Sequence, residues 1–167
     1  MIHDEHPFAT PDADREPVRR FRGRLSSPVT IITAGSPDSR TGLTISSLMV
    51  ADGDPSRIFF LCGLGNDLWS VIQDTIAFVV HVLEEDHRAL SDRFAGLRPS
   101  PGGLFAGLEV EDSPRGPVLT EIETRAGCEL IRMELSESYA LIEGSIEAVT
   151  FHDLSAPLQW FRGGYRR

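Results

Sequence analysis

The sequence predicts a mostly β protein, a β-barrel with short helices, in a chain of 167 residues. Two observations support this prediction. Short apolar runs rich in β-branched residues recur along the chain, and Gly- and Pro-rich stretches separate them, a pattern typical of strands and turns. Only a few stretches space their apolar residues as a helix does. A single domain with this many non-local strands favours a closed or split barrel, because closure removes the exposed edges of the sheet.

Residues 1–17 are predicted to be an N-terminal arm and residues 18–167 a single domain. The arm holds three prolines and mixed charge, which is typical of a terminal segment loosely attached to its domain. Val18, Phe21 and Leu25 then recur at helical spacing and predict a short amphipathic helix. Five arginines surround it, at positions 15, 19, 20, 22 and 24. They indicate either an anionic partner or, as we favour, a solvated face balanced by nearby acids.

The first strands are predicted to form a hairpin. Residues 29–33 are all β-branched, 34–42 form a loop rich in Gly and Ser, and 43–50 return as a strand. The next strand, 57–62, has consecutive apolar residues, so both of its faces are expected to be covered.

The rest of the chain alternates between short helices and strands. Helices are predicted over 68–75, capped by Asn66 or Asp67, and over 86–95, capped by Asp86. Further strands are predicted over 76–83, 117–123, 127–135, 139–149 and 157–161.

Composition excludes several classes of function. All 16 basic residues are arginine, so no lysine is present to form a Schiff base or to complete a Walker A motif. With a net charge of -9 the chain has no basic stripe for nucleic acid. It has no apolar run long enough for a membrane helix and begins without a signal peptide, so a cytoplasmic location is expected. Cys62 and Cys128 are interpreted as buried free thiols.

Two stretches could bind a ligand. Thr44 and Ser46 share one face of a strand, with Ser47 on the other, and offer hydroxyls after a flexible loop. From the pattern alone we favour a half-exposed structural strand over a ligand site. The turn at 63–67 opens a helix and could hold a phosphate, or could be an ordinary turn. His81 lies among apolar residues and is predicted to be a core histidine. The sequence contains no nucleophile elbow and no Cys/His cluster for a metal, which favours chemistry carried by a bound cofactor.

Several segments, in order, resemble the flavin-reductase-like family, whose fold is an FMN-binding split barrel with Greek-key-like connections. GLTISSL at 42–48 is similar to the family's Gly-x-Thr-x-Ser-Ser flavin segment. FVVHVL at 78–83 resembles a later strand of the family. Residues 87–96, which end in RFAG, resemble the helix that closes with Phe-Ala. PLQWFRGGY at 157–165 is similar to the family's C-terminal motif. VTIIT at 29–33 is similar to the family's opening strand, and the resemblance spans roughly Arg19 to Tyr165, almost the whole chain.

The resemblance implies a homodimer that binds FMN or FAD and transfers hydride to it from NADH or NADPH. Reduced flavin would then leave for a partner monooxygenase. The residues that the resemblance places at the flavin or its phosphate are Leu43, Thr44, Ser46, Ser47, Leu48, Asn66, Asp67, Arg93, Phe94, Ala95, Arg162 and Tyr165. Of these, Arg93 and Arg162 are the expected cationic contacts to an anionic cofactor.

Two positions differ from the family pattern. In the family, the phosphate loop after the strand often carries Ser, Lys or Arg, and Thr. In this chain the loop has the sequence GNDLW at 65–69. Tyr139 stands where the family tends to carry a histidine near the nicotinamide, and it is expected to contact the nicotinamide or flavin ring. Three hypotheses follow: an NAD(P)H-dependent flavin reductase, a non-catalytic dimeric module that binds flavin or another planar cofactor, and a dimeric scaffold whose site has decayed.

Overall fold

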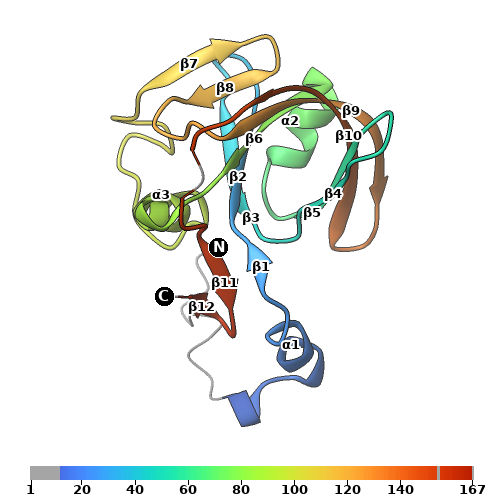
Figure 1. Cartoon of the computed structure of the whole chain (residues 1–167), viewed down its shortest axis with the longest axis vertical. Coiled ribbons are helices and arrows are strands. Elements are labelled where there is room, and N and C mark those ends of the chain that lie inside the picture. Colours follow the sequence, from blue (N-terminus) through green and yellow to red (C-terminus); the bar gives the residue numbers. More distant parts are fainter. Residues whose placement is uncertain (1–11, 154, 167) are drawn as a thin grey trace.

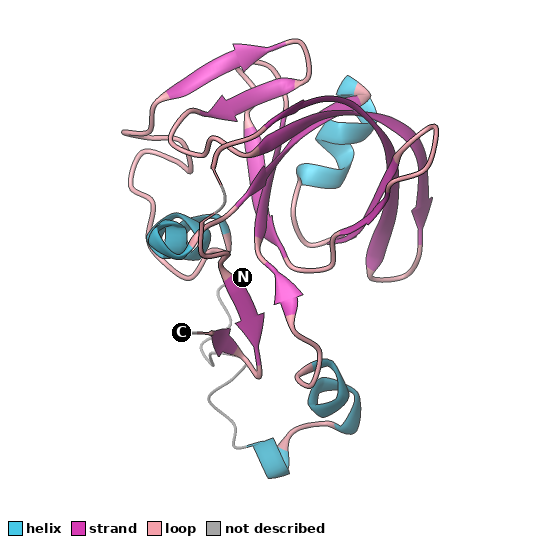
Figure 2. Cartoon of the chain, in the orientation of Figure 1, coloured by secondary structure: helices cyan, strands magenta, loops and turns pink. Residues whose placement is uncertain are grey.

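The computed structural model describes residues 12–153 and 155–166, and it confirms the mostly β architecture (Figures 1 and 2). The helical elements are η1 (Asp12–Asp14), α1 (Pro17–Arg22), α2 (Leu68–Thr75), η2 (Glu85–His87) and α3 (Arg88–Phe94). The strands are β1 (Ser27–Pro28), β2 (Thr30–Ala34), β3 (Thr41–Ile45), β4 (Met49–Ala51), β5 (Arg57–Gly63), β6 (Ala77–Val82), β7 (Val110–Ser113), β8 (Gly116–Leu119), β9 (Arg125–Leu135), β10 (Tyr139–Thr150), β11 (Gln159–Phe161) and β12 (Gly164–Tyr165). Most of the predicted N-terminal arm lies outside the described residues.

Seven antiparallel strands form the barrel, in the order β3-β2-β6-β9-β10-β5-β4. The strands β3 and β4 lie at opposite ends of this order, although only residues 46–48 separate them along the chain. The two edges therefore meet at a seam, as a split barrel requires. Ser47 bridges this seam, because its hydroxyl accepts a hydrogen bond from the Leu61 N–H (3.0 Å) and donates to the Leu61 carbonyl (3.2 Å).

This seam corrects the predicted first hairpin. The strands β2 and β3 do pair, with Thr30 opposite Ile45. The return strand predicted over 43–50 is wrong as one element: β3 ends at Ile45, and the chain resumes as β4, which pairs with β5. The pattern of apolar and hydroxyl residues continues across the break, so it did not reveal that the chain changes edges.

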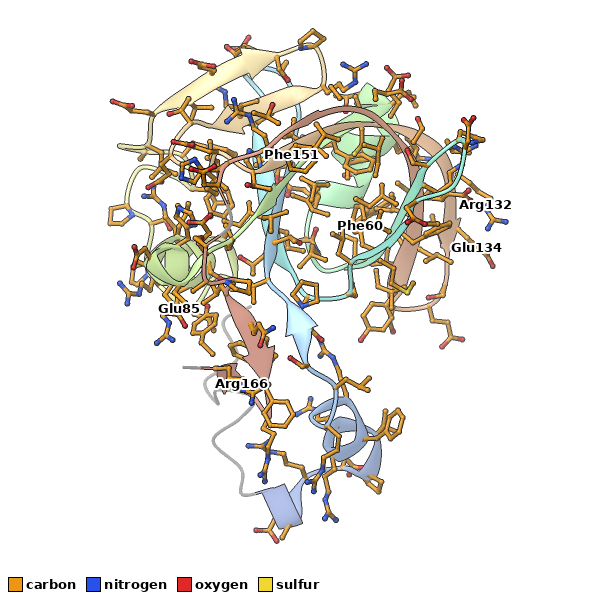
Figure 3. All side chains as sticks on the ribbon, viewed as in Figure 1. Phe60, Glu85, Arg132, Glu134, Phe151 and Arg166 are labelled. Atoms are coloured by element: carbon orange, nitrogen blue, oxygen red, sulfur yellow. The ribbon has the colours of Figure 1, made fainter. Side chains whose placement is uncertain are left out.

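The barrel interior is the larger of two apolar cores. Phe60 of β5 points into it (Figure 3) and packs edge-on against Phe78 of β6, with ring centroids 5.5 Å apart. The helix α2 adds Leu68 and Ile72 to this core. The prediction that both faces of β5 are covered is wrong for the described chain. Its residues alternate between inside and outside, and Leu61 on the outer face is 45% exposed.

A second core lies between the outer side of β2, α3 and the β7–β8 hairpin, which stands at the upper left of Figure 1. His81 of β6 is fully buried here, as predicted for a core histidine. Its Nε2 accepts the Leu119 N–H at 3.0 Å, so Nδ1 carries the proton and donates to the Ile31 carbonyl at 3.2 Å. Burial lowers the pKa of His81 to about 4, and the positive charge of Arg125 adds to this effect.

Local details of the other elements differ from the predictions at their ends. Asn66 accepts the Leu68 N–H at 3.0 Å and so caps the start of α2. The turn before α3 is capped by Glu84 and His87, not by Asp86. The strand predicted over 117–123 ends at Leu119, and β7 was not predicted, because its Glu and Asp residues hide the strand pattern.

The two cysteines are buried free thiols, as predicted. No helix within the described residues is long and apolar enough to cross a membrane.

The helix α1 and the strands β1, β11 and β12 extend away from the barrel, at the lower end of Figure 1. Ser27 of β1 pairs with Trp160 of β11, and β11 pairs with β12. The Arg162 N–H donates to the Gly23 carbonyl (3.2 Å), which joins the turn of this small hairpin to the end of α1. This extension forms one wall of the site described next.

Candidate functional site

A cavity of about 450 Å³ lies where α1, the segment after β3, α3 and the β11–β12 hairpin meet. Its volume falls within the range of small-molecule and cofactor sites. Residues from all four elements and from the start of β10 line it: Val18, Arg19, Arg22, Gly23, Leu25, Ser27, Val29, Thr44, Ser46, Ser91, Ala95, Leu97, Tyr139, Trp160, Arg162, Gly163 and Tyr165.

Hydroxyl side chains form the barrel side of the cavity. Thr44 and Ser46 both line it, as expected of alternate residues that leave a strand on one face. The Thr44 hydroxyl donates to the Ser91 carbonyl at 2.7 Å, which fastens β3 to α3. The Ser46 hydroxyl accepts a hydrogen bond from Arg22 Nη2 at 3.2 Å, which brings α1 to the same wall. Both oxygens keep lone pairs that could accept a further hydrogen bond.

Aromatic side chains of the C-terminal hairpin form the opposite wall. Tyr165 packs edge-on against Trp160, with ring centroids 5.0 Å apart, and the Arg88 guanidinium lies 5.5 Å from its ring centroid. The Tyr165 hydroxyl donates to Asp92 Oδ1 at 2.6 Å, and its oxygen lies 3.0 Å from Ser91 Oγ. Burial, followed by the bond to Asp92, raises the pKa of Tyr165 to about 12. Tyr165 therefore stays a neutral donor at physiological pH.

The cavity is cationic although the chain as a whole is acidic. Arg19, Arg22 and Arg162 line it, and no Asp or Glu occurs among its described lining residues. Tyr139 lies at its rim, where β10 begins, and is 53% exposed. The site therefore presents aromatic rings, hydroxyl groups and positive charge, which together suit a planar anionic ligand.

The structure brings five of the twelve resemblance-derived cofactor residues to this cavity. Besides Thr44 and Ser46, the cavity is lined by Ala95, Arg162 and Tyr165, together with Tyr139.

Four of the remaining residues lie behind the cavity wall. Leu43 and Leu48 pack against the barrel core, and Ser47 bonds to Leu61 at the seam. Phe94 is 1% exposed and packs edge-on against Phe105, with ring centroids 5.4 Å apart. These residues position the wall that Thr44 and Ser46 present.

The other three bond to the protein's own chain. Arg93 donates through Nη2 to the carbonyls of Gly103 (3.0 Å) and Ala106 (2.6 Å), which holds the loop after α3 in place. Asn66 caps α2, and Asp67 accepts the Thr41 hydroxyl at 2.5 Å. None of these three side chains lines the cavity.

Sequence reasoning missed the contribution of α1. Arg19 and Arg22 were counted among arginines on a solvated face, yet both line the cavity. Their spacing of three residues places them on one face of a helix and was the available signal. Ser91 and Trp160 were also missed, although each lies within or beside a motif of the resemblance.

The fold and the cavity together define a split-barrel protein with a cavity of small-ligand size beside the barrel seam. The family model of the flavin reductase like domain matches residues 22–167. The chain therefore belongs to the flavin reductase-like family, which confirms the resemblance seen in its motifs.

Curated relatives match over most of their length. The reductase subunit HsaB of a flavin-dependent monooxygenase from Rhodococcus jostii is 27% identical over 151 residues, which are 88% of this chain and 76% of the relative. The reductase component of 4-hydroxyphenylacetate 3-monooxygenase from Thermus thermophilus is 26% identical over 153 residues, which are 92% of this chain and 96% of the relative.

Solved structures share the fold. A flavin reductase domain protein from Arthrobacter superimposes with a TM-score of 0.81 at 24% identity, over 89% of this chain and 92% of that chain. The NADH:FAD oxidoreductase SgcE6 from Streptomyces globisporus, in complex with NAD and FAD fragments, gives a TM-score of 0.81 at 19% identity, over 95% of this chain and 94% of that chain.

Proposed function

We propose that this chain is an NAD(P)H-dependent flavin reductase that binds FMN or FAD, together with NADH or NADPH, in the cavity beside the barrel seam. The observation that supports this most strongly is the cavity itself. In a member of the flavin reductase-like family, it combines hydroxyl groups, aromatic rings and arginines at one place. Its volume suits a ligand of this size.

The lining residues fit a flavin in chemical terms. Trp160 and Tyr165 offer apolar ring surface, and Thr44 and Ser46 offer hydroxyls that can accept from or donate to a polar ring edge. Leu43, Ser47, Leu48 and Phe94 hold this wall from behind. Tyr139 lines the rim of the cavity, and we expect it to contact the nicotinamide or the flavin ring.

The protein's part in the reaction is orientation rather than proton transfer. A bound flavin supplies the acceptor for the nicotinamide hydride. The residues around it would orient the two rings toward each other and limit the access of water. Tyr165 stays protonated because its pKa is raised to about 12, and His81 is buried in the second core, so neither serves as a general base.

A homodimer is part of the proposal. Val18 and Phe21 on α1 are 79% and 70% exposed, and Met49 and Leu61 are exposed on the barrel's outer face. Side chains of this size in exposed patches mark interaction surfaces. A second copy would cover them and narrow the cavity beside α1. Sedimentation equilibrium is expected to give twice the chain mass, and a monomer at micromolar concentration would contradict this part.

Reduced flavin is proposed to leave for a partner monooxygenase, as the names of two relatives suggest for those proteins. We also propose a cytoplasmic location, because the free thiols of Cys62 and Cys128 fit a reducing compartment. A second candidate is a module that binds flavin without reducing it. The observation that favours it is Tyr139 in place of the family's histidine.

One experiment separates these candidates. Purified chain is mixed with FMN or FAD and with NADH or NADPH, and nicotinamide oxidation is followed while flavin fluorescence reports binding. Turnover that saturates with flavin supports the reductase. Binding without oxidation would favour the non-catalytic module. Neither binding nor oxidation with any pairing would contradict both, and would leave the scaffold with a decayed site.

A further inference from the structure

We propose that Arg19 and Arg22 of α1 recognise the phosphate group of the ligand, in place of the turn at 63–67. The inference deepens the proposed function and rests on it. The shared chemistry is a phosphate ester or pyrophosphate, which either the flavin or the nicotinamide dinucleotide could supply.

Side chains of the turn at 63–67 already form hydrogen bonds with backbone groups of the turn and of the helix that follows it. Asn66 donates to the Gly63 carbonyl at 2.5 Å, and its Oδ1 accepts the Leu68 N–H at 3.0 Å. An anion at the start of α2 would need that N–H group. The Asp67 carboxylate, which accepts the Thr41 hydroxyl, adds a negative charge at the same place. At this helix start the Leu68 N–H is therefore already occupied, and the nearby carboxylate disfavours a phosphate.

The cavity offers both. Its described lining contains three arginines and no carboxylate, in a chain whose net charge is -9. A concave site lined by one sign of charge concentrates its field and attracts ligands of the opposite sign. Guanidinium groups are also the side chains best suited to bind phosphate through paired N–H groups.

Arg19 and Arg22 are positioned to act together. They lie three residues apart on α1, on one face, and both line the cavity. The bond from Arg22 Nη2 to Ser46 Oγ, at 3.2 Å, fixes this guanidinium beside the hydroxyl wall. It uses one of five N–H donors of the group. A ligand whose rings lie against Thr44 and Ser46 would therefore extend its phosphate toward α1.

A purely structural role is the alternative. The arginines lie in the last turn of α1, where positive charge stabilises the helix end. Such a role would alter the stability of α1 without distinguishing ligands that carry a phosphate from ligands that lack one. The test therefore compares FMN with riboflavin, which has the same ring and no phosphate.

The experiment measures dissociation constants for FMN, riboflavin and ADP-ribose with the wild type, R19Q, R22Q and R22K. The control is R132Q, which removes the same charge from Arg132 on the outer surface of β9 (Figure 3), where it pairs with Glu143 at 3.3 Å. Circular dichroism and sedimentation confirm that each variant is folded and assembled as the wild type. Titrations are repeated at raised salt.

Loss of one charge-assisted contact should weaken the phosphate-bearing ligand about ten- to hundredfold in R19Q and R22Q, with R22K between them and the wild type. Riboflavin and the R132Q control should be unchanged. Weaker FMN identifies the flavin phosphate as the source, and weaker ADP-ribose identifies the dinucleotide. The inference is overturned if both variants bind every probe as the wild type does, or if riboflavin weakens as much as FMN. If the wild type binds no flavin and oxidises no nicotinamide, the proposed function itself fails.

Discussion

Tyr165 donates its phenolic hydroxyl to Asp92 at 2.6 Å and thereby fastens the C-terminal hairpin to α3. These two elements form adjoining walls of the cavity, so this one bond fixes much of its width. Tyr165→Phe should lower the free energy of unfolding by about 1 kcal/mol, the usual net worth of such a bond. Urea unfolding measures this. Tyr139→Phe is the matched control, since its exposed ring makes no side-chain hydrogen bond within the described residues, and it should leave stability unchanged.

The same bond predicts a dependence on alkaline pH. The pKa of Tyr165 rises from 10.0 to about 12 on folding, mainly through burial and then through Asp92. Its stabilising effect is therefore complete below pH 10 and is lost as pH rises through 12. The wild type should lose stability more steeply than Tyr165→Phe between these values. Parallel losses in the two proteins would contradict the assignment.

His81 predicts the opposite dependence, on acid. Its pKa falls from 6.5 to about 4 on folding, chiefly through burial. The unfolded chain therefore takes up a proton that the folded chain refuses, and stability decreases as pH falls from 6.5 to 4. The loss attributable to His81 is up to about 3 kcal/mol, at 1.36 kcal/mol for each pKa unit. Nuclear magnetic resonance titration of the His81 ring measures the pKa directly, and a midpoint near 6.5 would contradict the prediction.

Gly42 and Phe94 are in close contact, and this explains a glycine in β3. A Cβ on Gly42 would lie 2.7 Å from Phe94 Cε1 and 3.2 Å from the Ile32 carbonyl oxygen. Gly42→Ala should therefore cost about 1–3 kcal/mol through overpacking. Gly65→Ala is the control, because a Cβ there meets nothing within 4 Å. If the two residues are in contact, Gly42→Ala should lower the free energy of unfolding less in the F94L background than in the wild type. Equal costs in the two backgrounds would argue against direct contact.

This contact also shows why sequence motifs revealed the fold so well. The segments 42–48 and 93–96 were separate motifs of the resemblance, and Gly42 and Phe94 bring them together in space. Strands such as β2 and β6 were predictable because their β-branched runs reflect burial on both sides. The break between β3 and β4 was not, because Ser47 replaces strand pairing with side-chain bonds at the seam.

The site was less predictable than the fold. Thr44 and Ser46 line the cavity, as strand alternation indicated. Asn66, Asp67 and Arg93 have the residue types of ligand contacts, but their partners are main-chain carbonyls, an N–H group and a threonine hydroxyl. Such competition for partners depends on the folded backbone and leaves no signal in a single sequence.

Tyr139 is predicted to act on the nicotinamide side of the reaction. It lies at the cavity rim, so removing its ring should weaken nicotinamide binding more than flavin binding. Tyr139→Ala should raise the KM for the dinucleotide about tenfold, which corresponds to loss of roughly one stacking contact. Tyr139→Phe keeps the ring and should behave as the wild type. Equal effects of the two substitutions would instead assign the role to the hydroxyl.

The central claim is that this cavity supports hydride transfer to flavin, and anaerobic reduction tests it most directly. The purified chain is mixed with FMN or FAD without oxygen, NADH or NADPH is added, and the absorption of oxidised flavin and of reduced nicotinamide is recorded together. We predict that both decrease in equal molar amounts for at least one pairing, far faster than without protein. Unchanged flavin absorption with every pairing, in protein shown to be folded, would contradict the account.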